Sequence, residues 1–418
     1  MNKINVIFLG GIFPDSLEKE IIDNSIGPIQ YAANNLQKKI ISGLVQNGVS
    51  NFHVISAPFI APFPQGYKKI VFCNTAKEDR GHYRLTSVPF FNLFGIRNFS
   101  REFSVDRELV KHISSGPTVI LVYSLHSPLL RAAIKAKAKK DNLYVICIVP
   151  DLPQYMVFGD TSTIYKVLKA FDLRRIERSL KQVSGFVFLT DQMNDVLNIN
   201  HVPYTVVEGI GNQNTFEESH MKPSFFNEQI NNRYILYTGT LDFQYGIVEL
   251  LEAFVNIKKN KSQLSLKLVI CGDGDSKHRV INTMESNPDI YYLGQLPPSD
   301  VRYLQRNADF LINPRRNEGD YTRFSFPSKT MEYLSSGRPV LCYKLDGIPS
   351  EYNDYLKYID PDSDNGLEYA MKEMIELSDQ KKIDIGAKGA SFIKKQKNPK
   401  VMVKKVIELI ETILKGKV

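Results

Sequence analysis

The sequence predicts an α/β protein with two doubly wound domains, each built on a parallel sheet. Short, wholly apolar runs such as "TVILVYS" and "LKLVICG" recur along the chain. Such runs are typical of strands that are buried on both faces of a sheet. Stretches with helical spacing separate them, and the pattern occurs twice, interrupted by the polar segment 211–233. Strands alternating with helices indicate parallel α/β sheets, so we expect two domains of this class.

The expected elements follow in order along each half. In the first half the strand candidates are "INVIFLG", "NFHVIS", "KKIVFC", "TVILVYS", "LYVICIV", "GFVFLT" and "YTVVEGI", with helices such as "AANNLQKKIISGLVQNG" and "LLRAAIKAKAKKDN" between them. In the second half the strands are "YILYTG", "LKLVICG", "IYYLG", "ADFLINP", "PVLCYK" and "YLKYID", with helices such as "IVELLEAFVNIKKN" and "PSDVRYLQRN".

This order of elements predicts the domain boundaries. We expect residues 1–215 to form the first domain and residues 216–398 the second, with a final helix over 399–418 that packs back on the first. Ligands of doubly wound sheets bind beyond the carboxyl ends of the strands. Domain interfaces are also favoured places for pockets. The predicted site is therefore a central cleft that the two domains face.

Composition restricts the partners and the compartment. The 418 residues carry a net charge of +8, with a pI near 9.0. This excess suits a phosphate-bearing ligand or an anionic membrane surface, although solubility accounts for many such excesses. No run reaches the roughly eighteen apolar residues that a spanning helix needs. The sequence predicts a cytoplasmic protein, with peripheral contact to the inner face of the cell membrane as a further option.

The four cysteines do not predict a metal site. Cys73, Cys147, Cys271 and Cys342 are far apart and form no CxxC pair. Three of them lie in strand-like apolar runs, which indicates buried thiols in a reducing compartment.

The stretch "SFPSKTMEYLSSG" (325–337) has the pattern of a short helix with an anion site at its start. Proline is suited to the first turn and glycine to the helix end. Free N–H groups of Ser328, Lys329 and Thr330 would then face an anion, and the ammonium of Lys329 would add charge. Glu332, one turn further, accepts hydrogen bonds from a pair of sugar hydroxyls. A phosphate site next to a ribose site indicates a nucleotide. The alternative without a function is a capped helix whose Lys and Glu side chains are solvated.

The segments around this helix resemble the family 4 glycosyltransferases of the GT-B fold. The matching stretches are "YILYTGTLDFQYGIVELLEAF", "LVICGDGD", "IYYLGQLPPSDVRYLQRNADFLINP" and "FPSKTMEYLSSGRPVL", with weaker matches in "GPIQYAANNLQKKIISGLVQNG" and "IERSLKQVSGFVFLTDQMNDVL". The last of the strong matches is similar to members that build bacterial capsules, O-antigens and other surface polysaccharides. The resemblance implies a retaining glycosyltransferase that needs no metal or other cofactor. Its partners would be a nucleotide diphosphate sugar and a glycan or polyprenyl-diphosphate-linked acceptor.

The resemblance also implies roles for residues of the donor site. Glu332 matches the glutamate that holds the donor ribose. The segment Gly294-Gln295-Leu296 matches the backbone that receives the base. Gly272 matches the glycine turn after the second strand of that domain. Gly27, in "SIGPIQYAAN", matches the glycine loop that faces the donor diphosphate from the first domain.

The second half of the chain departs from the family pattern at three positions. Phe324 stands where the first glutamate of the motif is expected, and Thr240 and Tyr245 stand where the family places an arginine and a lysine. A departing diphosphate still needs positive charge, because stabilisation of developing charge is usually the largest catalytic contribution. The remaining local cations predict replacements, first Arg323 and Lys329 and then Arg315, since guanidinium and ammonium groups bind phosphate oxygens. A solvated loop charge is the alternative for each arginine.

Two residues at strand ends of the first domain are candidates for acceptor chemistry. In "VICIVPDLPQYM" a proline replaces the histidine that the family commonly shows, and Asp151 remains. Its carboxylate would orient the acceptor hydroxyl or accept its proton; a turn-forming aspartate is the alternative. His126, in "LVYSLHSPLL", also ends a strand, although a lone histidine is more often structural.

Two further patterns have simpler explanations. The "DGD" at 273–275 follows a buried strand and is expected to be a turn, not a metal site. Residues 131–181 contain eleven Lys and Arg against five Asp and Glu. There the helix "TIYKVLKAF" places Ile164, Val167, Leu168 and Phe171 on one face, which suits either a membrane surface or the protein core.

Other functions remain open from the sequence. A nucleotide-sugar 2-epimerase on the same fold is one alternative, but the strand ends are poor in the acids and histidines such an enzyme needs. A non-catalytic glycan- or nucleotide-binding member of the fold is another, because of the missing glutamate and cations. Nucleic acid is not an expected partner, since there is no recognised module and the positive charge is diffuse.

Overall fold

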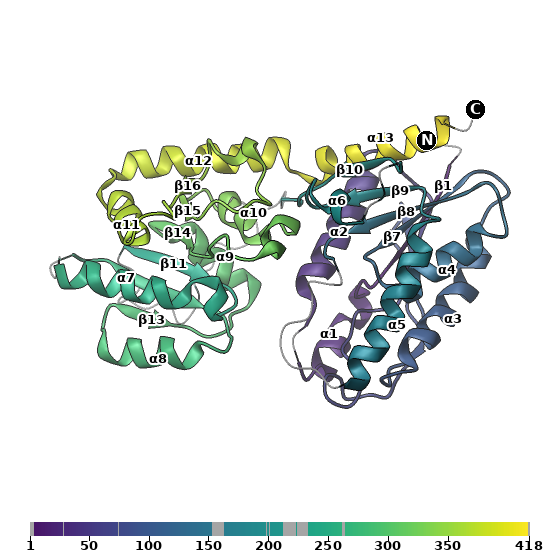
Figure 1. Ribbon diagram of the computed structural model, residues 1–418, viewed down its shortest axis with the longest axis horizontal. Coiled ribbons are helices and arrows are strands. Elements are labelled where there is room, and N and C mark those ends of the chain that lie inside the picture. The colour runs from purple at the N-terminus through teal and green to yellow at the C-terminus, as the bar shows by residue number, and fades with distance from the viewer. Residues whose placement is uncertain are drawn as a thin grey trace. The chain divides into compact units, whose positions relative to one another are not determined.

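The computed structural model describes residues 4–27, 29–73, 75–152, 163–197, 199, 201–211, 223, 233–260 and 264–416, with backbone only for 163–168, 320 and 321. The chain divides into two compact units. Unit 1 comprises residues 1–210 and 399–418, and unit 2 comprises residues 211–398. The division lies five residues before the expected one, and the final helix is part of unit 1 (Figure 1).

Unit 1 is built on a parallel sheet. Within the described residues the strand order is β10-β9-β8-β7-β1-β2-β5-β4, and only β4 is antiparallel to its neighbour. The strands are β1 (Asn5–Gly10), β2 (Phe52–Ser56), β4 (Lys77–Asp79), β5 (Tyr83–Ser87), β7 (Thr118–Tyr123), β8 (Leu143–Val149), β9 (Gly185–Phe188) and β10 (Tyr204–Val206). All six residues of β7 are buried, as its apolar sequence predicts.

One expected strand of unit 1 is not part of this sheet. Of "KKIVFC", only Val71 and Phe72 are extended, as β3, and they pair antiparallel with β6 (Phe90–Phe91) in a separate ribbon. The prediction that this run joins the parallel sheet was therefore wrong. The edge beyond β2 is taken instead by β5 and the charged β4, which the alternation of apolar runs did not indicate.

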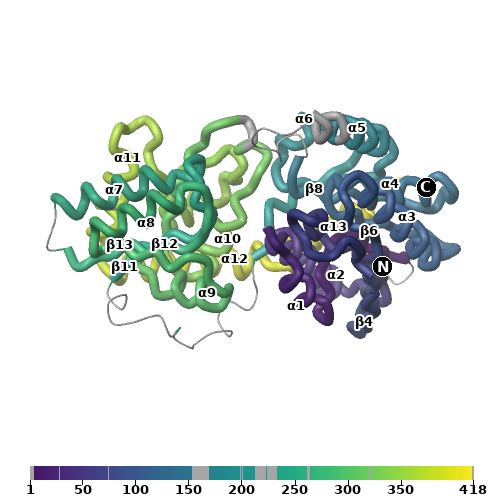
Figure 2. The backbone as a smooth tube through the Cα atoms, turned by 90° about the horizontal axis from the view of Figure 1, so that it is seen from below, coloured from purple at the N-terminus to yellow at the C-terminus, as the bar shows by residue number. Residues whose placement is uncertain are grey.

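Helices cover both faces of the unit 1 sheet. The helices of unit 1 are α1 (Asp15–Asn24), α2 (Tyr31–Gln46), α3 (Arg97–Leu109), α4 (Ser127–Lys137), α5 (Thr163–Leu180), α6 (Met193–Leu197) and α13 (Pro399–Lys415). Helix α13 lies against α2 on one face, which Figure 2 shows as yellow beside purple. Helix α4 contacts α3 and α5. Met402, Val406 and Ile410 of α13 belong to the same buried cluster as Ile40 and Leu44 of α2.

Unit 2 has a second parallel sheet, in the order β13-β12-β11-β14-β15-β16 among its described residues. Its strands are β11 (Tyr234–Thr238), β12 (Lys267–Cys271), β13 (Ile290–Tyr292), β14 (Phe310–Asn313), β15 (Val340–Cys342) and β16 (Lys357–Tyr358). Its helices are α7 (Ile247–Asn260), α8 (Lys277–Ser286), α9 (Pro298–Asn307), α10 (Ser328–Ser335), α11 (Gly366–Glu376) and α12 (Asp379–Gln396). The sheet separates two buried clusters, as in a doubly wound fold.

Two smaller expectations are confirmed, one for the first strand and one for the cysteines. The opening run forms β1, and Cys147, Cys271 and Cys342 are buried thiols, whereas Cys73 is exposed. In the part of the chain that is described, no helix has the length and apolar character to cross a membrane.

The close approach of α2 and α13 depends on Gly43. A Cβ atom at this position would lie 2.4 Å from the Pro399 carbonyl oxygen and 2.3 Å from Val403 Cγ2. Gly43→Ala is therefore expected to lower the free energy of unfolding by about 1–3 kcal/mol through overpacking, despite the better helix propensity of alanine. Urea unfolding would measure the change. Gly116→Ala is the matched control, because only Ser114 Oγ lies near its Cβ, at 4.0 Å; equal stability of the two variants would contradict the packing argument.

Candidate functional site

The candidate site of unit 2 lies where the strand order reverses. β11 has β12 on one side and β14 on the other, so the connections from the centre of the sheet run in opposite directions. Ligands of open α/β sheets bind beyond the carboxyl ends at such a point. Gly239 directly follows β11, and Arg315 follows β14 by two residues. The fold therefore brings the "GTL" turn and an arginine from "NPRR" to the same edge.

Glycines allow the loops at this edge to stack closely. The Gly239 N–H donates to the Cys271 carbonyl at 2.8 Å, and the Gly272 N–H donates to the Gly294 carbonyl at 2.8 Å. A Cβ atom on Gly272 would lie 1.7 Å from the Gly239 oxygen, and its φ of +140° also favours glycine. The predicted glycine turn at Gly272 is thus present. Gln295 is exposed, whereas Leu296 packs against the unit 2 core.

The Lys329 side chain covers the Gly239 turn. A Cβ atom on Gly239 would lie 1.4 Å from Lys329 Nζ. The ammonium lies 5.2 Å from the centre of the Tyr237 ring and 5.6 Å from that of Tyr245. Within the described residues it makes no hydrogen bond or ion pair. Lys329 keeps part of its surface exposed, while neighbouring protein atoms desolvate the ammonium and lower its pKa to about 8, an effect that Glu332 opposes and Arg315 supports.

Tyr245 connects the two cations of the site. Its ring lies 5.4 Å from the guanidinium carbon of Arg315, which is buried, and it also faces Lys329. Aromatic faces attract cations by about 0.5–2 kcal/mol. Tyr245 thus stands where the family was expected to place a lysine, and it positions two other cations instead.

Helix α10 presents its start to the same edge. The Thr238 N–H donates to the Tyr333 hydroxyl at 2.8 Å, which ties the helix to the end of β11. Ser328 and Glu332 are exposed, and Thr330 is buried. The Thr330 N–H donates to the Pro327 carbonyl at 2.9 Å. The prediction of a free Thr330 N–H was therefore wrong, because Pro327 precedes the helix and its carbonyl closes the first turn.

The remaining arginine candidate lies on the loop before α10. Arg323 is exposed in a short 3₁₀ segment (Asp320–Phe324), with its guanidinium carbon 5.9 Å from the Phe324 ring. Phe324 is itself buried, so an apolar side chain fills the position expected for a glutamate.

The "DGD" stretch is a turn, as predicted. The Asp275 N–H donates to Asp242 Oδ1 at 2.9 Å, and a Cβ atom on Gly274 would lie 2.5 Å from that oxygen. The turn at 273–275 therefore supports the loop after β11 through Asp242. Among the described residues, no three His, Cys, Asp or Glu side chains are grouped as metal ligands.

In unit 1 the strand order reverses at β1 and β7, and His126 lies at that point. It directly precedes α4, and its ring centre lies 5.1 Å from that of Phe59, which follows β2. Its Nδ1 atom is buried without a hydrogen-bond partner in the described part of the chain. Burial, together with the nearby Arg101 and Arg97, holds the pKa of His126 well below 6.5. The imidazole is therefore neutral at pH 7.

Two other predicted residues of unit 1 lie in loops. Asp151 follows β8 and retains exposed surface, while neighbouring protein atoms desolvate the carboxyl and raise its pKa to about 6. Gly27 lies between α1 and α2, and a Cβ atom there would meet nothing within 4 Å. On α5, Ile164, Val167 and Leu168 lie outside the described side chains, and Phe171 is exposed.

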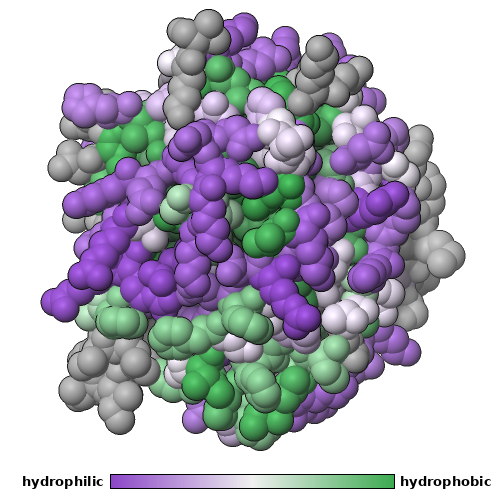
Figure 3. Space-filling view, turned by 90° about the vertical axis from the view of Figure 1, so that its right-hand side faces the viewer, coloured by the Kyte–Doolittle hydropathy of each residue, from purple (hydrophilic) through white to green (hydrophobic). Residues whose placement is uncertain are grey.

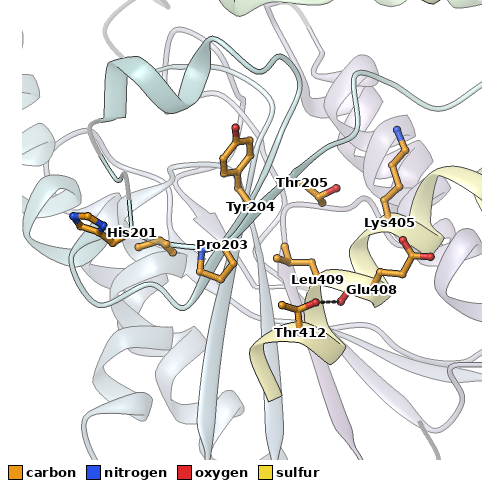
Figure 4. Close-up of a pocket in the computed structure, with 9 residues that line it drawn as sticks. His201, Pro203, Tyr204, Thr205, Lys405, Glu408, Leu409 and Thr412 are labelled. Atoms are coloured by element: carbon orange, nitrogen blue, oxygen red, sulfur yellow. Dashed lines mark hydrogen bonds between the residues drawn. The ribbon is translucent and has the colours of Figure 1, made fainter. Parts of the chain in front are cut away.

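A separate hollow in unit 1 does not match the predicted site. Figure 4 shows it beside β10 and α13, where Thr412 Oγ1 donates to the Glu408 carbonyl at 2.9 Å. Its floor includes the residues that enter β10, so it lies at the amino end of that strand, whereas ligands bind at carboxyl ends. The lining residues are His201, Val202, Pro203, Tyr204, Thr205, Lys405, Glu408, Leu409 and Thr412.

Sequence reasoning missed several residues of the unit 2 site. Gly239, Asp242 and the rings of Tyr237 and Tyr245 surround or support Lys329. All four lie in "YTGTLDFQYG", directly after a predicted strand at the centre of the sheet. The position of this segment could have indicated them, but the direction of each side chain could not be read from the sequence.

The desolvated ammonium of Lys329 should lower the stability of the protein. Lys329→Met is expected to raise the free energy of unfolding at pH 7 by about 1–3 kcal/mol. The gain should be complete below pH 8 and disappear as the pH rises towards 10.5, where the unfolded chain also loses this proton. Urea unfolding at pH 7 and pH 10 would test this, with the exposed Lys388→Met as control. A similar change in both variants would show that Lys329 is well solvated.

Comparison with known proteins supports a glycosyltransferase. Residues 221–391 match the family model described as Glycosyl transferases group 1. The D-inositol 3-phosphate glycosyltransferase of Corynebacterium kroppenstedtii is 27% identical over 129 residues, which are 29% of this chain and 27% of that protein. The chain therefore aligns with only about a quarter of the length of this curated relative.

Solved structures match over nearly the whole chain. Sucrose-phosphate synthase from Thermosynechococcus elongatus has a TM-score of 0.67 at 14% identity, covering 99% of this chain and 100% of the other. A trehalose-6-phosphate synthase from Burkholderia multivorans has a TM-score of 0.66 at 11% identity, with 99% and 98% covered. Such low identities establish the fold alone. Residues 221–391 thus match the glycosyl transferases group 1 family, and the chain as a whole has the GT-B fold, with two Rossmann-like units.

Proposed function

We propose that this chain transfers a sugar from a nucleoside diphosphate donor to a glycan hydroxyl, with retention of configuration and without a metal ion. The observation that carries this proposal is the position of Lys329. Its ammonium covers the Gly239 turn at the reversal point of the unit 2 sheet, and it forms no ion pair with the carboxylates of the described residues. An anionic ligand at this edge would supply the missing counter-charge.

The donor diphosphate is assigned to the groups around Lys329. Arg315 and Lys329 face the same Tyr245 ring and would together stabilise charge that develops on the leaving diphosphate. The Ser328 N–H, at the start of α10, would add a donor favoured by the helix dipole. The buried Thr330 Oγ1 has no hydrogen-bond partner among the described residues. Arg323 would approach the diphosphate from the exposed loop.

The rest of the donor is assigned by position along the same edge. Glu332 is exposed one turn into α10, and its carboxylate would accept hydrogen bonds from the ribose diol. The segment Gly294-Gln295-Leu296 adjoins Gly272 through a backbone hydrogen bond and would receive the base. Gly27 of unit 1 would allow close approach of backbone to the diphosphate.

Unit 1 would supply the acceptor side of the reaction. The neutral imidazole of His126 can accept a hydrogen bond or a proton from a hydroxyl. Asp151, with a pKa near 6, is mostly ionised at pH 7 and would orient the acceptor hydroxyl. A lipid-linked precursor of a bacterial surface polysaccharide is the acceptor that we propose.

The comparisons support the general reaction and not this specific acceptor. One structural neighbour, a trehalose-6-phosphate protein from E. coli, has UDP-2-fluoro glucose bound and a TM-score of 0.64 at 13% identity. The names of these relatives refer to sugar phosphates and an inositol phosphate, so the polysaccharide role rests on the resemblance of "FPSKTMEYLSSGRPVL". The buried Phe324 keeps a non-catalytic nucleotide-binding protein as the second candidate.

Nucleotide binding tests the donor site directly. UDP, GDP, CDP, ADP and dTDP are compared by thermal unfolding, and one is expected to stabilise the protein by about 2.7 kcal/mol at a hundred times its dissociation constant. Glu332→Ala and Lys329→Ala should lose most of this effect. Lys388→Ala, an exposed lysine of α12, should keep it. If no nucleotide stabilises the wild type, the donor site is not where we place it.

The pKa of Lys329 predicts how binding depends on pH. The ammonium is charged below about pH 8 and neutral above it. Affinity for the preferred nucleoside diphosphate should therefore fall by up to about tenfold between pH 7 and pH 9. Titration calorimetry at both pH values would measure the change. Lys329→Arg keeps its charge and should bind with little pH dependence; an equal loss in this variant would assign the effect to another group.

A further inference from the structure

Helix α3 exposes an apolar stripe that the proposed reaction does not use. Ile96, Phe99, Phe103 and Val110 are exposed to 48%, 54%, 69% and 54%. Phe99 and Phe103 belong to α3, and Ile96 and Val110 flank its two ends. Their spacing of three, four and seven residues places all four on the same side. Single exposed apolar side chains are common, whereas a continuous stripe indicates an interaction surface.

The stripe continues beyond α3. The Arg175 guanidinium carbon lies 4.8 Å from the centre of the Phe99 ring and 5.7 Å from that of Phe171 on α5, so these two exposed rings flank one arginine. The Asn92 N–H donates to the Ile70 carbonyl at 2.7 Å, which brings Ile70 beside the segment leading into α3. We call the whole set the apolar patch: Ile70, Phe91, Leu93, Phe94, Ile96, Phe99, Phe103, Val110 and Phe171.

The helices that carry the patch are held together by a buried carboxylate. Glu102 on α3 lies 3.0 Å from Arg131 Nε, 2.9 Å from Lys135 Nζ and 2.6 Å from a guanidinium nitrogen of Arg175. Burial by itself would raise the pKa of Glu102, but the cations, led by Lys135 and Arg131, lower it. The patch therefore lies on a fixed platform of α3, α4 and α5.

Positive charge exceeds negative charge on the helices that carry the patch. Helices α3, α4 and α5 together contain eleven Lys and Arg against five Asp and Glu, which is most of the net charge of +8. Arg107, Arg174 and Arg178 are exposed and have no anionic partner among the described residues. Figure 3, which looks onto the side where Figure 1 labels α3 and α4, shows a band of hydrophilic side chains with apolar ones gathered below it.

We propose that the apolar patch docks unit 1 on an anionic lipid surface. Aromatic side chains would insert at the level of the headgroups, and the surrounding cations would pair with lipid phosphates. A second copy of the chain fits less well, because a two-fold interface brings the same surface against itself and would oppose cations to cations. The inference rests on the proposed function in one respect: an enzyme has to bind the membrane surface if its acceptor is lipid-linked.

Vesicle binding tests the surface. The wild-type chain and Phe99→Ser/Phe103→Ser are sedimented with vesicles of phosphatidylcholine alone or of phosphatidylcholine mixed with the anionic lipid phosphatidylglycerol. The wild type should bind the anionic vesicles, and the double variant should bind at least about tenfold more weakly. Tyr369→Ser is the matched control, because Tyr369 on α11 is also 69% exposed but lies outside the patch.

Three outcomes would overturn the proposal: no binding of wild type to anionic vesicles, equal binding by the double variant, or a wild-type dimer that the double variant abolishes. Sedimentation velocity without lipid detects the dimer. Thermal stabilisation by the preferred nucleotide is measured on every variant. If the wild type is stabilised by a nucleotide but does not bind vesicles, only the docking surface is wrong. If no nucleotide stabilises the wild type, the proposed function is wrong.

Discussion

The desolvated ammonium of Lys329 is the constraint around which the unit 2 site is organised. A desolvated cation that has no ion-pair partner among the described residues costs free energy, and the lowered pKa reflects this cost. The surrounding residues reduce this free-energy cost. Gly239 leaves room for the ammonium, and the rings of Tyr237 and Tyr245 face it. Proteins commonly keep such costs at positions where a ligand supplies the missing charge.

This arrangement depends on connections between loops from three strands. Asp242 receives a backbone N–H from the turn after β12, and Gly272 bonds to Gly294 after β13. Tyr333 ties α10 to the last residue of β11. Each bond is modest, about 1 kcal/mol, but together they determine where Lys329 and the start of α10 lie. These bonds restrain the loops before any ligand binds, which reduces the entropy cost of binding.

Unit 1 has a different character, because it combines the proposed acceptor side with an exposed apolar surface. The helix that ends the chain completes its core through contacts with α2, and Gly43 allows the two helices to approach. On the other face of the sheet, Glu102 holds α3, α4 and α5 together under a surface rich in phenylalanine and arginine. The neutral His126 lies at the reversal point of this sheet, where ligands of the fold class bind.

The sequence alone was sufficient for the fold class and for most strands and helices, because wholly apolar runs such as "TVILVY" can be satisfied only inside a sheet covered on both faces. It also indicated the glycine at 272, the turn at 273–275 and the helix end at Gly337. It wrongly assigned residues 71–72 to the parallel sheet, since a two-residue pairing has no distinctive pattern. It also predicted a free N–H at Thr330, which in the structure donates to the Pro327 carbonyl. Only the tertiary structure decided which cation covers Gly239, that Tyr245 faces both Arg315 and Lys329, and that α3 carries an exposed stripe. Spacing specifies which residues share a face, whereas burial and partners depend on what the rest of the chain packs against that face.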